Sequence, residues 1–271
     1  MHYEEKEIQV AGSQPGTKLH IYIQDSSDAL CWKERPLVLV CPGGGYQHTS
    51  DREAEPVAMQ FLSRGYHVAV LRYSVAPAVY PTALLELCAS MIYIREHAKE
   101  WSVKSDAIYV GGFSAGGHLA ASLGVFWKTD KQLADYFQVE AEVLQPNALI
   151  LCYPVITSGE YAHRGSFDNL LAGKQELLDK MSLENQVNEY VPKTFIWHTF
   201  EDKSVPLENS LYFAKALREH NIPFEYHVFP NGHHGLGLAN RLSESEPGID
   251  TQKACQAWIS LCKTFLEENC E

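Results

Sequence analysis

The residues with the clearest chemical pattern are Gly112-Phe113-Ser114-Ala115-Gly116, a G-x-S-x-G sequence. An apolar run at 108–110 precedes them, and a helix-compatible stretch at 118–123 follows. A serine in so sharp a turn from strand to helix takes a strained backbone conformation, and larger side chains at 112 and 116 would collide with the neighbouring elements. The strain exposes the hydroxyl, so the pattern predicts that Ser114 is a nucleophile. The alternative is a glycine-rich turn with a passive serine.

A glycine-rich loop, Pro42-Gly43-Gly44-Gly45-Tyr46, follows the apolar run at 37–40. Consecutive glycines let the backbone approach a bound group and turn N–H groups toward it. Acyl transfer needs such donors for the oxyanion; one comes from the residue after the nucleophile, here Ala115, and another from a loop of this kind. We expect Gly44 and Gly45 to supply it. A phosphate-binding loop is disfavoured because its G-K-[ST] and G-x-G-x-x-G spacings are missing, which leaves a plain turn as the alternative.

A serine hydroxyl becomes a good nucleophile only when a base removes its proton, and a carboxylate must orient that base. With the nucleophile in a G-x-S-x-G turn, the order along the chain is Ser, then Asp or Glu, then His. Glu201 and Asp202 are the candidate acids, because they follow the apolar run at 195–197. His233 and His234 are the candidate bases, because they follow the apolar run at 226–229.

The elements that must position these residues are short apolar runs alternating with helical patterns. This alternation predicts a parallel sheet covered by helices. Residues 19–23 alternate apolar and polar side chains, as an antiparallel edge strand does. Continuous apolar runs, typical of strands buried on both faces, lie at 37–40, 68–71, 108–110, 148–151, 195–197 and 226–229. Apolar stripes at helical spacing lie at 84–98, 211–217 and 254–265.

The segment from Thr157 to Tyr190 interrupts this alternation, because it is longer than the usual connection between elements. It mixes polar and aromatic side chains. We interpret it as a small insertion over the sheet, either lid-like or a loop with a short surface helix. The chain has no internal repeat or long linker, so we expect a single α/β domain over residues 1–271 with this insertion at about 157–190.

The acidic composition excludes several function classes. The chain has 271 residues and a formal net charge of −12, which argues against nucleic acid and an anionic membrane surface as partners. No run reaches the ~18 apolar residues of a membrane span. Residues 1–10 contain neither the basic region nor the apolar core of a secretory signal. The expected location is therefore cytoplasmic.

The seven cysteines do not form a metal-binding or disulfide pattern. They stand at positions 31, 41, 88, 152, 255, 262 and 270, with no C-x-x-C pair. Most fall in apolar runs or helical stripes, so we expect reduced and mostly buried thiols. These cysteines therefore give no reason to expect a zinc site.

Four segments, PGGGY, GFSAGGHLAASL, HTFEDKSVP and GHHGLGLA, resemble in order and spacing the α/β-hydrolase superfamily, in its esterase/lipase branch. The resemblance runs from about Leu19 to Phe265. Within the branch the chain is similar to bacterial acetyl-esterase-like proteins, including carbohydrate-esterase and xylan-related ones. The resemblance implies the α/β-hydrolase fold with an eight-stranded, mostly parallel sheet, acyl-enzyme chemistry on small esters, and neither metal nor cofactor. Pro42 departs from the pattern, since many esterases of this branch carry His there.

The resemblance also chooses between the candidate acids and bases. A D-x-x-V-P sequence after a strand resembles the acid loop of these hydrolases and favours Asp202 over Glu201. Related esterases carry the base as His-Gly, which favours His234, the residue before Gly235, over His233. The chain is thus expected to be a serine hydrolase of small esters, with a short acyl group and a carbohydrate as one candidate alcohol.

Two other functions share this scaffold. A small peptidase of the prolyl-oligopeptidase type is disfavoured, because too few residues precede the sheet for the propeller that such enzymes usually carry. A non-catalytic ligand binder is disfavoured, because such proteins commonly lose a member of the catalytic set, and all three members are present here. The expected partner is a small-molecule ester, and homo-oligomerisation stays open because edge strands and an exposed helix could both pair.

Overall fold

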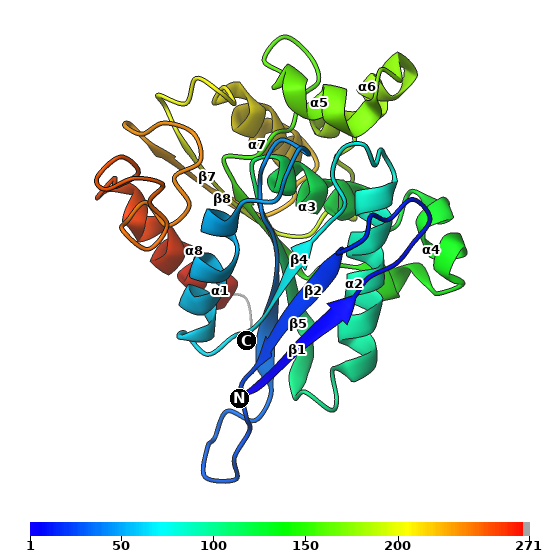
Figure 1. Ribbon diagram of the computed structural model, residues 1–271, viewed down its shortest axis with the longest axis vertical. Coiled ribbons are helices and arrows are strands. Elements are labelled where there is room, and N and C mark those ends of the chain that lie inside the picture. The colour runs from blue at the N-terminus through cyan, green and yellow to red at the C-terminus, as the bar shows by residue number, and fades with distance from the viewer. Residues whose placement is uncertain (268–271) are drawn as a thin grey trace.

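The computed structural model describes residues 1–267, and eight strands form one sheet (Figure 1). Their order across the sheet is β1-β2-β4-β3-β5-β6-β7-β8. Only β2 runs antiparallel to its neighbours, and the remaining adjacent pairs are parallel. This confirms the predicted eight-stranded, mostly parallel sheet. The strands are β1 (His2–Glu7), β2 (Lys18–Ile23), β3 (Arg35–Cys41), β4 (His67–Arg72), β5 (Val103–Phe113), β6 (Ala148–Cys152), β7 (Thr194–Thr199) and β8 (Phe224–Phe229).

The edges of the sheet differ from the sequence-based expectation. The strand expected at the edge, residues 19–23, is antiparallel as predicted but lies second in the sheet, because β1 pairs along its outer side. β1 has the sequence HYEEKE, and charged, mostly exposed side chains gave no apolar pattern. At the other edge, β8 is only partly buried rather than buried on both faces, since no strand covers its outer side in the described chain.

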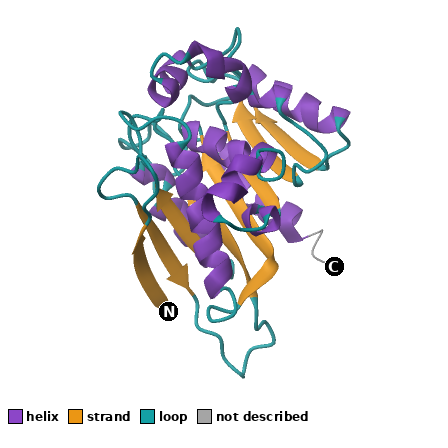
Figure 2. Cartoon of the chain, turned by 90° about the vertical axis from the view of Figure 1, so that its right-hand side faces the viewer, coloured by secondary structure: helices purple, strands orange, loops and turns teal. Residues whose placement is uncertain are grey.

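Helices cover both faces of the sheet. On one face α1 and α8 pack around Phe61 and Trp258. On the other face α2, α3 and α7 pack around Leu87, Leu119 and Phe213. Figure 2, viewed from the side of α2 and α4, shows the strands behind helices. The helices are α1 (Glu55–Leu62), α2 (Thr82–His97), α3 (Ala115–Phe126), α4 (Lys131–Phe137), α5 (Arg164–Leu171), α6 (Leu178–Met181), α7 (Glu208–Glu219) and α8 (Trp258–Glu267), with single 3-10 turns η1 (Asp51–Glu53), η2 (Ala141–Leu144), η3 (Gln175–Leu177), η4 (Leu183–Asn185) and η5 (Cys255–Ala257).

The segment at 157–190 carries two short helices, α5 and α6, at the top of the molecule in Figure 1. Phe167 and Leu170 of α5 and Met181 of α6 are buried in the core on the α2–α3 face. The segment is also tied to α3, because the buried imidazole of His118 hydrogen-bonds the Met181 carbonyl oxygen at 3.0 Å. It therefore packs against the body of the protein through apolar side chains of its own.

The described residues contain six free cysteines, of which Cys31 is exposed and the other five are buried. This agrees with the expected thiols, while Cys270 lies outside the described residues. No cluster of His, Cys, Asp or Glu suited to a metal ion occurs within residues 1–267. Across the same residues, none of the helices has the length and apolar character needed to cross a membrane.

Candidate active site

Ser114 lies at the carboxyl end of β5, between the strand and α3, with φ 52° and ψ −119°. A non-glycine residue rarely adopts a positive φ, so the backbone is strained as expected for a nucleophile turn. A Cβ on Gly112 would overlap the carbonyl oxygen of Gly116, and one on Gly116 would overlap that of Cys41. These contacts confirm the predicted steric need for glycine at both positions.

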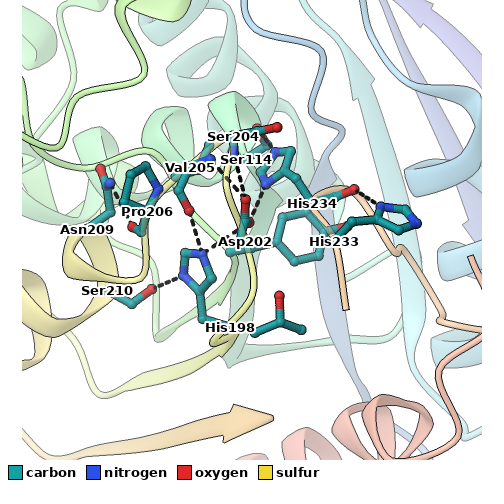
Figure 3. Close-up of polar contacts among 12 residues, drawn as sticks. Ser114, His198, Asp202, Ser204, Val205, Pro206, Asn209, Ser210, His233 and His234 are labelled. Atoms are coloured by element: carbon teal, nitrogen blue, oxygen red, sulfur yellow. Dashed lines mark hydrogen bonds and ion pairs between the residues drawn. The ribbon is translucent and has the colours of Figure 1, made fainter. Parts of the chain in front are cut away.

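Three predicted residues from distant parts of the sequence meet at this turn (Figure 3). Nε2 of His234 lies 2.7 Å from Oγ of Ser114, and Nδ1 of His234 lies 2.6 Å from Oδ2 of Asp202. Because a carboxylate only accepts hydrogen bonds, Nδ1 carries the proton, and Nε2 accepts from the serine hydroxyl. This tautomer can take the serine proton as the oxygen attacks.

Four donors hold the carboxylate of Asp202. The backbone N–H groups of Ser204 and Val205 donate to Oδ1 at 3.0 and 2.9 Å, while His198 and His234 lie on Oδ2. Burial acts to raise the pKa of Asp202, but the hydrogen bonds from the two histidines outweigh it and hold the pKa well below its usual value. The side chain therefore stays ionised at neutral pH.

A second histidine, His198, also hydrogen-bonds the carboxylate of Asp202. The sequence did not indicate this contact. The buried Nε2 of His198 faces two acceptors, Oδ2 of Asp202 at 3.2 Å and the carbonyl oxygen of Val205 at 3.0 Å, so Nε2 carries a proton. Nδ1 lies 2.7 Å from the hydroxyl of Ser210. No local spacing signals this contact, because His198 lies in β7 and Asp202 in the loop that follows it.

The two rival candidates point elsewhere. His233 is exposed, and its Nε2 pairs with Asp250 at 3.2 Å rather than with the nucleophile. Glu201 is exposed and accepts from the N–H of Gly232 at 3.2 Å. The geometry therefore brings together Ser114, Asp202 and His234, and it leaves Glu201 and His233 outside the hydrogen-bonded line.

The glycine loop lies against the nucleophile turn. Gly44 and Gly45 have φ of 128° and 64°, and the carbonyl of Gly44 accepts from the N–H groups of Gln47 and His48. Within residues 1–267, no hydrogen bond uses the N–H groups of Gly44 and Gly45. Ala115 is the first residue of α3, where the backbone N–H has no partner within the helix. All three proposed oxyanion donors are thus free to bind a ligand.

Helix α5 of the insertion borders the same loop. Nδ2 of Asn169 donates to the carbonyl oxygen of Gly45 at 2.9 Å, and Cε1 of His163 lies 3.9 Å from the position of a Cβ on Gly45. Burial, more than the nearby His234, lowers the pKa of His163 and favours its neutral form. Sequence reasoning missed both residues, because nothing in the local sequence shows that this segment folds onto the glycine loop.

A cleft of about 580 Å³ opens beside His234. Its lining comes from the two loops that carry the acid and the base: Phe200, Glu201, Asp202, Lys203, Ser204, His233 and His234. The ring of Phe200 is 71% exposed and forms a flat apolar surface among charged and hydroxyl groups. The cleft therefore offers both stacking and hydrogen bonding to a polar ligand next to the imidazole.

The sheet and the strand–turn–helix around Ser114 define an α/β hydrolase. The chain belongs to the BD-FAE family, whose model matches residues 19–217. Two solved structures agree with this assignment over nearly the whole fold. An acetyl ester-xyloside bifunctional hydrolase from Caldicellulosiruptor lactoaceticus is 39% identical, with a TM-score of 0.81 over 94% of this chain and 89% of that one. The carboxylesterase Cest-2923 from Lactobacillus plantarum is 28% identical, with a TM-score of 0.85 over 99% and 98%.

Curated relatives are named for ester and xylan hydrolysis. The chain is 39% identical to endo-1,4-beta-xylanase B of Butyrivibrio fibrisolvens over 76% of its own length and 33% of that protein. It is 28% identical to an acetylxylan esterase of Xylanibacter ruminicola over 73% of its own length and 40% of that protein. The chain thus spans less than half the length of these two relatives.

Proposed function

We propose that this protein is a serine hydrolase that cleaves small carboxylic esters through an acyl-enzyme on Ser114. The observation that carries the proposal is the continuous hydrogen-bonded line from Asp202 through His234 to the hydroxyl of Ser114. It ends at the turn beside the glycine loop, where no acceptor within residues 1–267 binds the N–H groups of Gly44 and Gly45. Carboxylesterases and acetyl esterases among the similar proteins support an ester as the substrate.

In this mechanism Ser114 attacks the ester carbonyl while Nε2 of His234 takes its proton. Asp202 fixes the imidazole through Nδ1 and stabilises its charged form. The N–H groups of Gly44, Gly45 and Ala115 hold the oxyanion of the tetrahedral intermediate; losing one such donor typically costs on the order of 10²–10³ in rate. His234 then protonates the leaving alcohol, and a water activated by the same imidazole releases the acid.

The proposed substrate is a short-chain acyl ester, such as an acetyl ester, of a carbohydrate. The imidazole must protonate the alcohol oxygen, so the alcohol portion departs beside His234, the residue by which the cleft adjoins the nucleophile, since Ser114 itself does not line the cleft. Phe200 can stack on a sugar ring, while Lys203 and Ser204 offer hydrogen bonds to hydroxyl groups. Relatives named acetylxylan esterase and acetyl ester-xyloside hydrolase support this class. The single domain with a lid-like insertion and the cytoplasmic location stay predictions.

The test compares purified wild type with Ser114→Ala on p-nitrophenyl esters from acetate to octanoate and on acetylated xylo-oligosaccharides. Ser122→Ala is the matched control, because Ser122 is a buried serine of α3, the helix that follows Ser114, and lies outside the hydrogen-bonded line. We expect Ser114→Ala to lose on the order of 10⁴-fold or more in kcat, and Ser122→Ala to keep nearly wild-type activity. A fluorophosphonate probe should label the wild type and not Ser114→Ala.

Three outcomes would contradict the proposal. A wild type that is labelled by the probe but cleaves only peptides would indicate the peptidase. Absence of both labelling and hydrolysis would indicate a ligand binder. Hydrolysis of p-nitrophenyl acetate that persists in Ser114→Ala would assign the esterase activity to another site.

A further inference from the structure

Glu53 is a buried carboxylate that the steps above do not use. It ends the 3-10 turn η1, which follows the glycine loop, and its side chain is 4% exposed. Among residues 1–267 no Lys or Arg pairs with it. Burying a carboxylate is costly unless its oxygens meet donors, and Glu53 meets two: the N–H of Gly43 at 2.9 Å on Oε2 and the hydroxyl of Tyr153 at 2.6 Å on Oε1.

The first donor belongs to the glycine loop. A Cβ on Gly43 would lie 2.7 Å from Oε2 of Glu53 and 3.0 Å from Cβ of Ser114, so carboxylate and nucleophile flank the same side of Gly43. The hydrogen bond holds the peptide group between Pro42 and Gly43 in place. The orientation of the next two N–H groups, those of Gly44 and Gly45, depends on that peptide group.

The second donor leads to the loop that carries His234. The hydroxyl of Tyr153, just after β6, accepts from the N–H of Gly237 at 2.8 Å while it donates to Glu53. The Tyr153 ring also packs edge-on against the ring of His234, with centroids 5.1 Å apart. Tyr153 thus contacts the proposed base with its ring and anchors the base loop with its hydroxyl.

We propose that Glu53 is a positioning residue. It fixes the glycine loop, residues 42–46, relative to the loop that carries His234. The inference rests on the proposed function, since it assumes that Gly44 and Gly45 bind the oxyanion. A mutual displacement of these loops would separate the proton-transfer partner from the oxyanion donors. Misplacement of such groups by about 1 Å is enough to cost on the order of 10²-fold in rate.

A carboxylate suits this place because both of its partners donate. In Glu53→Gln, the single amide oxygen can still accept from the N–H of Gly43, but the amide NH₂ then faces the hydroxyl of Tyr153. That hydroxyl would accept from the amide and from Gly237, which leaves its own proton without the acceptor it has now. The substitution keeps the size of the side chain and replaces the hydrogen bond that Tyr153 donates by one that it accepts, which weakens the link between the loops.

The experiment measures kcat, KM and inhibition by a trifluoromethyl ketone, which forms a tetrahedral adduct on serine, for wild type, Glu53→Gln and Glu86→Gln. Glu86 is the matched control: a buried carboxylate on α2 that accepts from Ser13 and Ser74, outside the proposed machinery. For Glu53→Gln we expect kcat to fall about 10- to 100-fold with KM little changed. The ketone should bind more weakly by a similar factor. Glu86→Gln should lower the melting temperature and leave kcat nearly unchanged.

Tyr153→Phe gives a second test should Glu53→Gln not fold. It keeps the ring against His234 and removes only the hydroxyl, so kcat should again fall at nearly constant KM. Wild-type kcat and ketone affinity in a folded Glu53→Gln, or in Tyr153→Phe alone, would overturn the inference. An equal loss of kcat in Glu86→Gln would do so too. In these cases loss of hydrolysis in Ser114→Ala would leave the proposed function standing, whereas a wild type without esterase activity would remove both.

Discussion

Replacing Asp202 by Asn tests whether this carboxylate sets the proton position on His234. In the structure all four neighbours of the carboxylate donate to it, two as backbone N–H groups on Oδ1 and two as imidazole N–H groups on Oδ2. An amide of the same shape must place its NH₂ against one of these two pairs.

The backbone pair decides the orientation of the amide. The N–H groups of Ser204 and Val205 cannot become acceptors, so the Asn oxygen takes the Oδ1 position and its NH₂ takes the Oδ2 position. Nδ1 of His234 then becomes an acceptor, and the proton moves to Nε2. In that tautomer the imidazole cannot accept the proton of Ser114.

The size of the effect follows from the wrong tautomer, which in a comparable serine–histidine–aspartate site lowers kcat by about 10⁴-fold. At about 1.36 kcal/mol for each tenfold change, this is roughly 5 kcal/mol of transition-state stabilisation. We expect Asp202→Asn to lose about this factor in kcat on p-nitrophenyl acetate at neutral pH. KM should change little, because the side chain of Asp202 is fully buried behind the imidazole.

Glu201→Gln is the control, since it makes the same chemical change one residue earlier on an exposed side chain. We expect it to keep kcat within a few-fold of the wild type, because its partner is the loop N–H of Gly232. Retention of more than about a tenth of wild-type kcat by Asp202→Asn would refute the tautomer argument. A large loss in Glu201→Gln alone would move the acid role to Glu201.

The two histidine variants should differ in esterase activity. We expect His234→Ala to lose nearly all of it and His233→Ala to keep most of it. His233→Ala should instead have a lower melting temperature, because it loses the pair with Asp250. Similar losses of kcat in both variants would contradict this assignment. Stability should also fall in acid. Asp202 and Asp250 have lowered pKa values in the folded protein, so their stabilisation is full above the unfolded pKa of about 3.9 and is lost as pH falls through the folded values. Melting temperatures from pH 7 to pH 2 check this, and a profile that stays flat below about pH 4 would count against it.

Sequence predicted best where backbone geometry restricts the residue type. Ser114 and its flanking glycines were identifiable because the turn tolerates no side chain at 112 and 116, and the central strands because burial on both faces demands continuous apolar runs. The sequence alone left His233 and His234 open as the base, and the distances to Ser114 and Asp202 separate them. β1 escaped prediction because its mostly charged and exposed side chains form no apolar pattern.

The missed residues act through contacts between distant segments. Glu53 stands in a short polar turn, and its partners Gly43 and Tyr153 are 10 and 100 residues away along the chain. Asn169 reaches Gly45 across 124 residues. Such contacts have no local period or spacing, so only the folded chain shows them.

The direction of the strands also affects how this domain can be joined to others. β1 is parallel to β3–β8, so His2 lies at the amino-terminal ends of these strands, opposite the loops that carry Ser114 and His234. The carbonyl of Leu266, in α8, accepts from Lys193, just before β7, and so also lies at the amino-terminal ends of the strands. A module joined before His2 or after Leu266 would therefore extend away from the cleft. The fold can therefore be joined to a further module at this side and still leave the nucleophile accessible.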